Sequence, residues 1–283
     1  MRLGVHVSVA GGVDRAVDRA LEKGCDAFQI FTTNPRSWRS KPVSAESIER
    51  FVSRLRGSEL SPAVAHMPYL PNLASPKDDV YEKSVQALTA EVMRCQELGI
   101  PYLVTHLGSH LGEGTEYGLE RIVNALDTAL SRTESDVVVL LENSAGTVNS
   151  MGSSFSEIAS ILESLPEQSR SLGVCLDTCH LFAAGYDLRT SLAVEETLCQ
   201  FQGCVDLGKV MLVHLNDCRG PLGSHLDRHE HIGLGHIGES GFRAILSHPA
   251  MQRTPMILET PVDSRRDDQS NLDVARSLAS ARK

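Results

Sequence analysis

Short apolar runs alternate with amphipathic stretches along the whole chain. The apolar runs are rich in β-branched residues and have the length of buried strands; they cover residues 3–9, 27–32, 63–67, 102–108, 137–143, 173–178, 209–216 and 255–260. Between them, apolar residues recur at the three- and four-residue spacing of helices over residues 13–24, 45–57, 78–99 and 115–132. Eight strand–helix units predict an α/β fold with parallel strands, the TIM (β/α)8 barrel.

The polar residues at the ends of the runs separate a closed barrel from a doubly wound open sheet, which would show the same alternation. Six successive runs carry a His, Asp or Glu at or near their ends: His66, His106, Glu142, Asp177, His214 and Glu259. In a barrel the carboxyl ends of all strands meet on one face, so these six side chains would point into one pocket. An open sheet would spread them along an edge, and the pattern therefore favours the barrel.

Length and composition fit a single barrel domain over residues 1–283. TIM barrels close at roughly 250 residues, and no linker or low-complexity segment divides the 283 residues of this chain. The 41% hydrophobic and 22% charged residues exclude the disordered and fibrous classes. No run reaches the roughly 18 apolar residues of a membrane span and the first residues lack a secretory pattern, so we expect a cytoplasmic protein without a membrane partner.

Three further residues join the six at the strand ends and define a candidate metal constellation. His180 follows Asp177 by three residues, and Asp227 and His229 stand together after the seventh run. Five histidines and four carboxylates exceed the four or five ligands of one zinc ion, so two or three ions are implied. Imidazole and carboxylate ligands favour zinc over manganese or iron. The seven cysteines include no CxxC pair, which argues against a disulfide framework and a thiolate zinc site.

The other histidines are left out of the constellation. His6 lies on the first predicted strand and is expected to line the pocket without holding a metal. The rest are expected in loops or at the surface: His110, His225, His231, His236 and His248. A GxGxxG-like match at Gly233, Gly235 and Gly238 follows no predicted strand. It is therefore a weak sign of dinucleotide binding, and we expect a loop there.

Two or three clustered metal ions point to phosphoryl transfer. Two ions about 3.5 to 4 Å apart can hold a hydroxide at neutral pH, and a third can neutralise the leaving oxygen. No GxSxG elbow or P-loop suggests a competing chemistry. The net charge of −9 would disfavour a nucleic-acid partner, but three divalent ions would offset six of these charges at the place where a phosphate binds. Hydrolysis of a phosphodiester is the expected reaction.

Long motifs spread over almost the whole chain resemble the endonuclease IV family of apurinic/apyrimidinic endonucleases. They read HVSVAGG, FTTNPRSW, HMPYLPNLAS, HLGSH, ENSAG, CLDTCHLFAAGYDLRT, HLND, DRHEHIGLGHIG and LETP. The resemblance implies a TIM barrel with three zinc ions per chain, with manganese as a substitute. It also implies a monomer that acts on double-stranded DNA containing abasic sites or blocked 3' ends, in base excision repair.

The same resemblance implies a role for each of the nine residues. The first zinc would be held by His66, His106 and Glu142; the second by Glu142, Asp177, His214 and Glu259; and the third by His180, Asp227 and His229. The catalytic carboxylates would be Glu142, as bridging ligand and possible base, with Asp177 and Glu259. The expected reaction is hydrolysis 5' to the abasic sugar, which leaves a 3'-hydroxyl and a 5'-deoxyribose phosphate.

Four residues are expected to contact DNA. Arg36, Tyr69 and Leu70 match the residues that the family inserts at the flipped abasic nucleotide, and Trp38 lies in a basic loop with Arg36, Arg39 and Lys41. The sequence departs from the family at ENSAGTVNSMG and at Pro35. These departures concern how the protein holds DNA around the lesion, and they change none of the expected metal ligands. The alternative is a xylose-isomerase-like sugar isomerase or epimerase, in which the pair Asp227 and His229 would have no counterpart.

Overall fold

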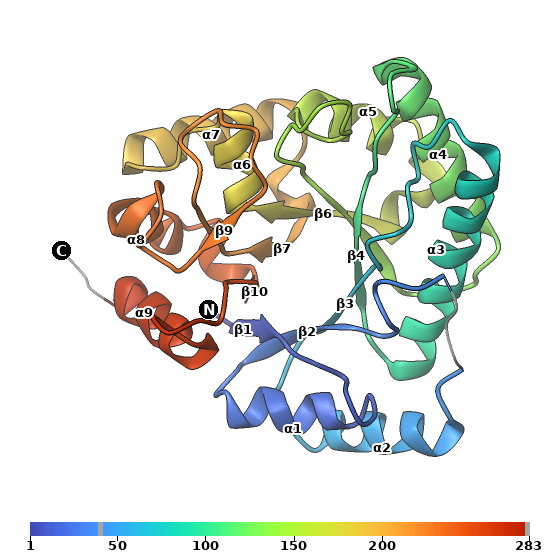
Figure 1. Cartoon of the computed structure of the whole chain (residues 1–283), viewed down its shortest axis with the longest axis horizontal. Helices are drawn as coiled ribbons and strands as arrows, with labels where there is room; N and C mark the ends of the chain where they lie inside the picture. Colours follow the sequence, from blue (N-terminus) through green and yellow to red (C-terminus); the bar gives the residue numbers. More distant parts are fainter. Residues whose placement is uncertain (39–41, 281–283) are drawn as a thin grey trace.

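The computed structural model describes residues 1–38 and 42–280. Eight parallel strands form a closed barrel in the order β1-β10-β7-β6-β5-β4-β3-β2 (Figure 1). The strands are β1 (Leu3–His6), β2 (Ala27–Phe31), β3 (Ala63–His66), β4 (Tyr102–His106), β5 (Val138–Glu142), β6 (Leu172–Asp177), β7 (Val210–His214) and β10 (Met256–Leu258). Each strand corresponds to one predicted apolar run, and the predicted TIM barrel is confirmed.

Helices surround the barrel on its outer side (Figure 1). They are α1 (Arg15–Glu22), α2 (Ala45–Arg56), α3 (Asp78–Leu98), α4 (Thr115–Ser131), α5 (Phe155–Glu163), α6 (Thr178–Ala184), α7 (Ser191–Cys204), α8 (Gly238–Ser247) and α9 (Asp268–Ser280), with the 3-10 turns η1 (Pro166–Ser171), η2 (Leu207–Lys209) and η3 (Met251–Arg253). The four stretches with helical periodicity correspond to α1 to α4.

Local chemistry fixes where the helices begin and end. Helix α2 begins after Ser44, whose side chain accepts a hydrogen bond from the amide of Ser47, as expected of an N-cap. Helix α3 ends at Gly99, which has a φ of 65° and supplies the left-handed conformation of a C-cap. The described residues contain no helix that is long and apolar enough to cross a membrane.

One layer of apolar side chains fills the barrel interior below the site. Its seven members come from seven different strands: Ala27, Val64, Val104, Leu140, Cys175, Leu212 and Ile257. On the remaining strand, β1, the corresponding residue is Gly4, where a Cβ atom would lie 1.7 Å from the carbonyl oxygen of Ala27. The interior is thus a packed core, as is usual for this fold.

A layer of polar side chains lies above this apolar layer, two residues further along each strand. Side chains two residues apart on a strand point to the same side of the sheet. Two residues after each member of the apolar layer, and after Gly4, the chain carries His6, Gln29, His66, His106, Glu142, Asp177, His214 and Glu259. The fold therefore gathers these polar side chains at the carboxyl end of the barrel.

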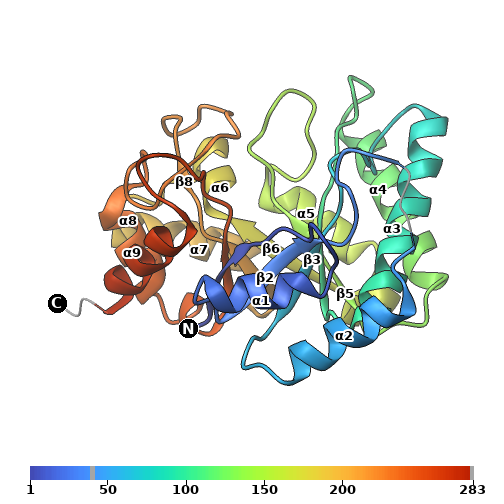
Figure 2. The same cartoon turned by 60° about the horizontal axis from the view of Figure 1, so that its bottom comes forward.

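Two short strands were not predicted. β8 (Asp217–Cys218) and β9 (His229–Glu230) pair antiparallel, with Asp217 opposite Glu230 and Cys218 opposite His229. Figure 2 shows β8 near α6, among the long loops that rise on one side of the barrel. Two residues are too few to show a period, so the sequence pattern could not reveal this hairpin.

Candidate metal centre

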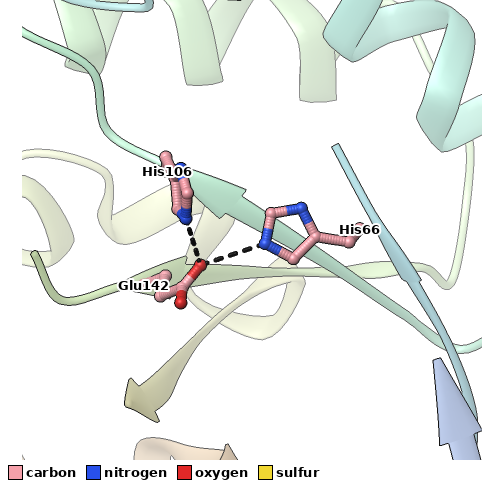
Figure 3. Close-up of side chains that lie close together, drawn as sticks. All are labelled: His66, His106 and Glu142. Carbon is pink, nitrogen blue, oxygen red and sulfur yellow. Dashed lines mark hydrogen bonds and ion pairs between the residues drawn. The ribbon is translucent and has the colours of Figure 1, made fainter. Parts of the chain in front are cut away.

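The carboxylate of Glu142 lies between histidines from strands on both sides of β5. Its Oε2 atom is 3.1 Å from Nε2 of His66 and 3.0 Å from Nε2 of His106 (Figure 3). Its Oε1 atom is 2.9 Å from Nδ1 of His214. Glu142 is almost completely buried. Each of its two carboxylate oxygens faces a different set of potential ligands.

A second group of potential ligands forms around His214. Its Nδ1 atom is 3.4 Å from Oε2 of Glu259 and 3.9 Å from Oδ2 of Asp177. Together with Glu142, these residues offer one nitrogen and three carboxylate oxygens that all lie within 4.8 Å of one another. Glu142 thus belongs to two groups, the first with His66 and His106 and the second with His214, Asp177 and Glu259.

The third group joins helix α6 to the β8–β9 hairpin segment. Nε2 of His180 is 3.1 Å from Oδ1 of Asp227, and Nε2 of His229 is 3.6 Å from the same oxygen. Asp177 caps helix α6 because its Oδ1 atom accepts a hydrogen bond of 2.8 Å from the amide of His180. The cap fixes His180 beside the second group. The structure therefore brings all nine sequence-predicted ligands together at the barrel mouth.

The histidine rings are oriented as metal ligands require. The Nδ1 atoms of His66, His180 and His229 face the backbone carbonyls of Met67, Asn143 and Glu259 at 2.7, 2.9 and 3.1 Å. Such contacts fix the ring and leave Nε2 for a metal. Within the described residues, the buried Nε2 atoms of His180 and His229 form no hydrogen bond of good geometry, although Oδ1 of Asp227 lies 3.1 and 3.6 Å from them. Since buried polar atoms are normally satisfied, these two nitrogens fit a cation.

The electrostatics of the centre also favour cations. Burial alone would lower the pKa of His180, but the carboxylates of Asp177, Asp227 and Glu142 raise it to about 10. Burial alone would raise the pKa of Glu142, yet His106 and His214 hold it well below its usual range. The carboxylates favour the protonated form of the neighbouring histidines. Divalent metal ions can replace these protons, because a histidine must lose its proton when it binds a metal.

A fourth combination of potential ligands includes a thiol. Cys179 lies within 4.8 Å of Asp177 and His229. Its hydrogen bond to Cys218, together with burial, raises the pKa of the Cys179 thiol well above its usual range. Because the thiolate is the form that binds metal, this combination is a poor site. The three groups of imidazoles and carboxylates remain the candidates.

Gln29 is a functional residue that the search for metal-type side chains missed. It is fully buried, and its Nε2 atom donates a hydrogen bond of 2.7 Å to Oε1 of Glu259. His6, which was expected to line the pocket, does so, with Nδ1 at 3.1 Å from Gln29 Nε2. The signal that could have found Gln29 is its position, two residues after Ala27 in the inward-facing register.

The histidines that were left out of the constellation belong to none of the groups in the described part of the chain. His110, His225, His236 and His248 lie outside the strands and are exposed or half-buried. His231 corrects the expectation of a surface position, because it is fully buried. Its ring contacts Asp263 at 3.0 Å and Asn271 at 2.9 Å, and these two partners satisfy it inside the protein.

Of the four residues expected to contact DNA, one lines the cavity of the metal centre. Tyr69 lines a cavity of about 390 Å³ together with His66, His106 and Glu259, and 59% of Tyr69 is exposed. Trp38 and Leu70, at 42% and 38% exposure, line a separate cavity of about 180 Å³. Arg36 is exposed. The structure thus places one of these four residues in the metal cavity, while Arg39 and Lys41 are outside the described residues.

The loop that carries Arg36 is anchored on the N-terminal side of this residue. Thr32 and Thr33 donate hydrogen bonds to the carboxylate of Glu91, which is buried in helix α3. The carbonyl of Pro35 accepts a hydrogen bond of 3.1 Å from the amide of Tyr69. Pro35, which departs from the family motif, therefore joins this loop to the loop with Tyr69.

Comparison with known proteins decides between the two enzyme classes that the sequence left open. Residues 17–283 match the model of the Xylose isomerase-like TIM barrel family. A probable endonuclease 4 from Methanoculleus marisnigri is 54% identical over 280 residues, which cover 99% of each chain. The crystal structure of endonuclease IV from Thermus thermophilus superposes with a TM-score of 0.88 at 38% identity, over 98% of both chains. The chain belongs to the endonuclease IV family.

The expected enzyme class is therefore confirmed, and the groups of His, Asp and Glu at the barrel mouth are consistent with the metal sites typical of endonuclease IV. A D-tagatose 3-epimerase-like protein also matches 98% of this chain and 97% of its own length, with a TM-score of 0.74 but 18% identity. That likeness shows the shared barrel fold alone. It does not support the sugar isomerase or epimerase alternative.

Proposed function

We propose that this endonuclease IV protein hydrolyses the DNA phosphodiester bond 5' to abasic sites and trims blocked 3' ends in base excision repair. The products would be a 3'-hydroxyl and a 5'-deoxyribose phosphate. The observation that carries the proposal is the convergence of three groups of imidazoles and carboxylates at one barrel mouth, with Glu142 shared by two of them. Relatives named endonuclease 4 over 99% of the chain support it.

Three zinc ions per chain would occupy these groups, and manganese could substitute. The first ion would be held by His66, His106 and Glu142; the second by Glu142, Asp177, His214 and Glu259; and the third by His180, Asp227 and His229. Bound zinc would supply a hydroxide at neutral pH and positive charge opposite the leaving oxygen. The ligand set supports zinc because it combines imidazole nitrogen with carboxylate oxygen.

The carboxylates at the centre have separate tasks. Glu142 directs one oxygen to each of two groups and would bridge them, or accept a proton from the attacking water. Asp177 accepts a hydrogen bond of 2.7 Å from Nδ2 of Asn216, which fixes the oxygen that faces the metal centre. Glu259 is held by Gln29 through Oε1, so its Oε2 atom stays directed at His214.

Damaged double-stranded DNA is the proposed partner, bound by a monomer. Tyr69 and Leu70 are exposed apolar side chains on the loop after β3, and such side chains act as wedges that separate base steps. Arg36 could stack on a base and meet a phosphate at once. Trp38 would add an aromatic contact from the same loop as Arg36.

Incision of a defined duplex tests the proposal. The substrate is an end-labelled oligonucleotide duplex with one tetrahydrofuran abasic analogue, and the control is the same duplex with a normal nucleotide at that position. We expect a single cut 5' to the lesion and a product that a DNA polymerase extends without further treatment, because its end is a 3'-hydroxyl. Equal cutting of both duplexes, or a product that cannot be extended, would refute the proposed specificity or reaction.

A further inference from the structure

A buried aspartate outside the proposed ligand set forms hydrogen bonds at the base of the segment that carries two of the proposed ligands. Asp217 follows His214 by three residues and is fully buried. Its Oδ1 atom accepts hydrogen bonds from the amides of Cys218 at 2.8 Å and Ile237 at 3.0 Å. Its Oδ2 atom accepts them from the amides of Gly235 at 2.9 Å and Gly238 at 3.3 Å.

Burial raises the pKa of Asp217, and these amides oppose that shift without a cationic side chain. Among the described residues, no Lys, Arg or His forms an ion pair with Asp217. A buried carboxylate normally has a charged or hydrogen-bonding partner, and for Asp217 the partners are backbone amides. Ile237 and Gly238 supply two successive amides to this anion, and such an arrangement is called a nest, which often binds a phosphate. Here the anion is the protein's own carboxylate.

The nest explains the glycine motif GLGHIG, which the metal site does not account for. A Cβ atom at Gly235 would lie 2.5 Å from Oδ1 of Asp217 and 2.4 Å from the carbonyl oxygen of Cys218. Gly238 has a φ of 70°, in the left-handed region that favours glycine. The glycines therefore allow the backbone to approach and surround the Asp217 carboxylate.

The position of the nest in the chain gives it a consequence for the metal centre. The chain leaves β8 at Cys218 and returns to the nest at Gly235, so Asp217 closes the base of a segment over residues 219–234. The closure is reinforced by a hydrogen bond of 2.8 Å from the amide of His236 to the carbonyl of Cys218. Asp227 and His229 lie inside this segment, and His229 is the register partner of Cys218.

We propose that Asp217 is a positioning residue for the third metal group, because it holds the 219–234 segment so that Asp227 and His229 face His180. Asp217 itself contacts none of the atoms proposed to bind metal. The inference rests on the proposed function, since it needs a metal ion in the third group.

Asp217→Asn tests the inference because it replaces one acceptor oxygen by an NH2 group that faces backbone donors. We expect the variant to retain two zinc ions per chain after desalting, and its third zinc to bind roughly 10- to 100-fold more weakly, the usual effect of changing a residue that supports metal ligands. Chelator competition measures the affinity. Gly235→Ala, which inserts a methyl group at the nest, should act in the same direction.

A measurement without metal separates this inference from the proposed function. In metal-free Asp217→Asn, hydrogen exchange at the amides of residues 219–238 should be faster than in the metal-free wild type, while the barrel strands remain protected. Asp14→Asn is the control, because Asp14 is a buried carboxylate bound to Ser47 and Arg50 away from the segment. It should retain three zinc ions and unchanged exchange at residues 219–238.

Three outcomes would overturn the positioning role. Any one of them is sufficient: unchanged exchange over residues 219–238 in Asp217→Asn, full affinity of this variant for the third zinc, or equal weakening of the binding of all three zinc ions. A wild-type protein that binds only two zinc ions would instead refute the third ion in the proposed function. In that case, faster exchange in Asp217→Asn would still show that Asp217 closes the segment, and the claimed link to a metal would be lost.

Discussion

The Oε1 atom of Gln29 lies 2.9 Å from Nε2 of His214, and this contact determines which nitrogen of His214 faces the metal centre. Because the amide oxygen accepts a hydrogen bond from the Nε2–H group, the proton of neutral His214 is held at Nε2. Nδ1, which is 2.9 Å from Glu142, is then free to bind a metal. Gln29 simultaneously holds Glu259 through its NH2 group.

Replacing Gln29 by Leu should therefore weaken zinc binding in the second group by roughly 10- to 100-fold, as measured by chelator competition. Incision should fall with zinc occupancy and recover when zinc is added in excess. Gln96→Leu is a matched control, because Gln96 contacts the carbonyl of Glu134 and no proposed ligand. Wild-type zinc affinity in Gln29→Leu would contradict the role given to this hydrogen bond.

Glu142→Gln preserves the shape of the side chain and removes its negative charge. Because Glu142 is shared by two groups of potential ligands, we expect incision to fall by orders of magnitude. Binding to the abasic duplex, measured by fluorescence anisotropy, should change little, since the exposed residues proposed to contact DNA are untouched. Near-normal turnover would contradict the proposal that Glu142 bridges two metal ions.

Arg36→Ala should weaken binding to the abasic duplex by about tenfold, which corresponds to about 1.4 kcal/mol. The expected reason is the loss of a planar cation that stacks and pairs with phosphate. Arg36→Lys keeps the charge but not the plane, so it should lie between the wild type and Arg36→Ala. Binding to undamaged duplex serves as the reference, and equal affinity of all three proteins for the abasic duplex would exclude an inserting role for Arg36.

Zinc loading should release protons. The pKa of His180 is raised to about 10 in the metal-free centre, so the ring is protonated at pH 7 and must lose its proton to bind zinc. Zinc affinity should therefore rise as the pH increases towards 10. Calorimetry at pH 7 in buffers of different ionisation enthalpy measures the release, and a binding enthalpy that does not depend on the buffer would show that His180 is already neutral.

The barrel and the gathering of the six strand-end members of the proposed ligand set could be predicted from the sequence, because both follow from the strand pattern. Seven of the eight strands, all except β2, carry a His, Asp or Glu at or directly after their last residue. This residue repeats the inward register, as with Val64 and His66 or Leu140 and Glu142. Closure of the barrel then brings the strand ends together without further information.

The parts that could not be predicted depend on contacts between distant segments. Gln29 is neither charged nor a typical metal ligand, so only its register marks it. His231 occurs in a polar stretch, and its burial depends on Asp263 and Asn271, more than thirty residues away in sequence. Asp217 could not be singled out from the sequence, because three of its four donors come from a glycine motif about twenty residues later and the fourth is the amide of Cys218.

Zinc titration into metal-free protein, followed by incision of the abasic duplex and by zinc content in the same samples, tests the central claim most directly. We predict that incision is absent without metal and reaches its maximum only when three zinc ions are bound per chain. Maximal incision with fewer than three bound zinc ions, or incision by protein that retains none, would contradict a trinuclear centre built from the nine residues at the barrel mouth.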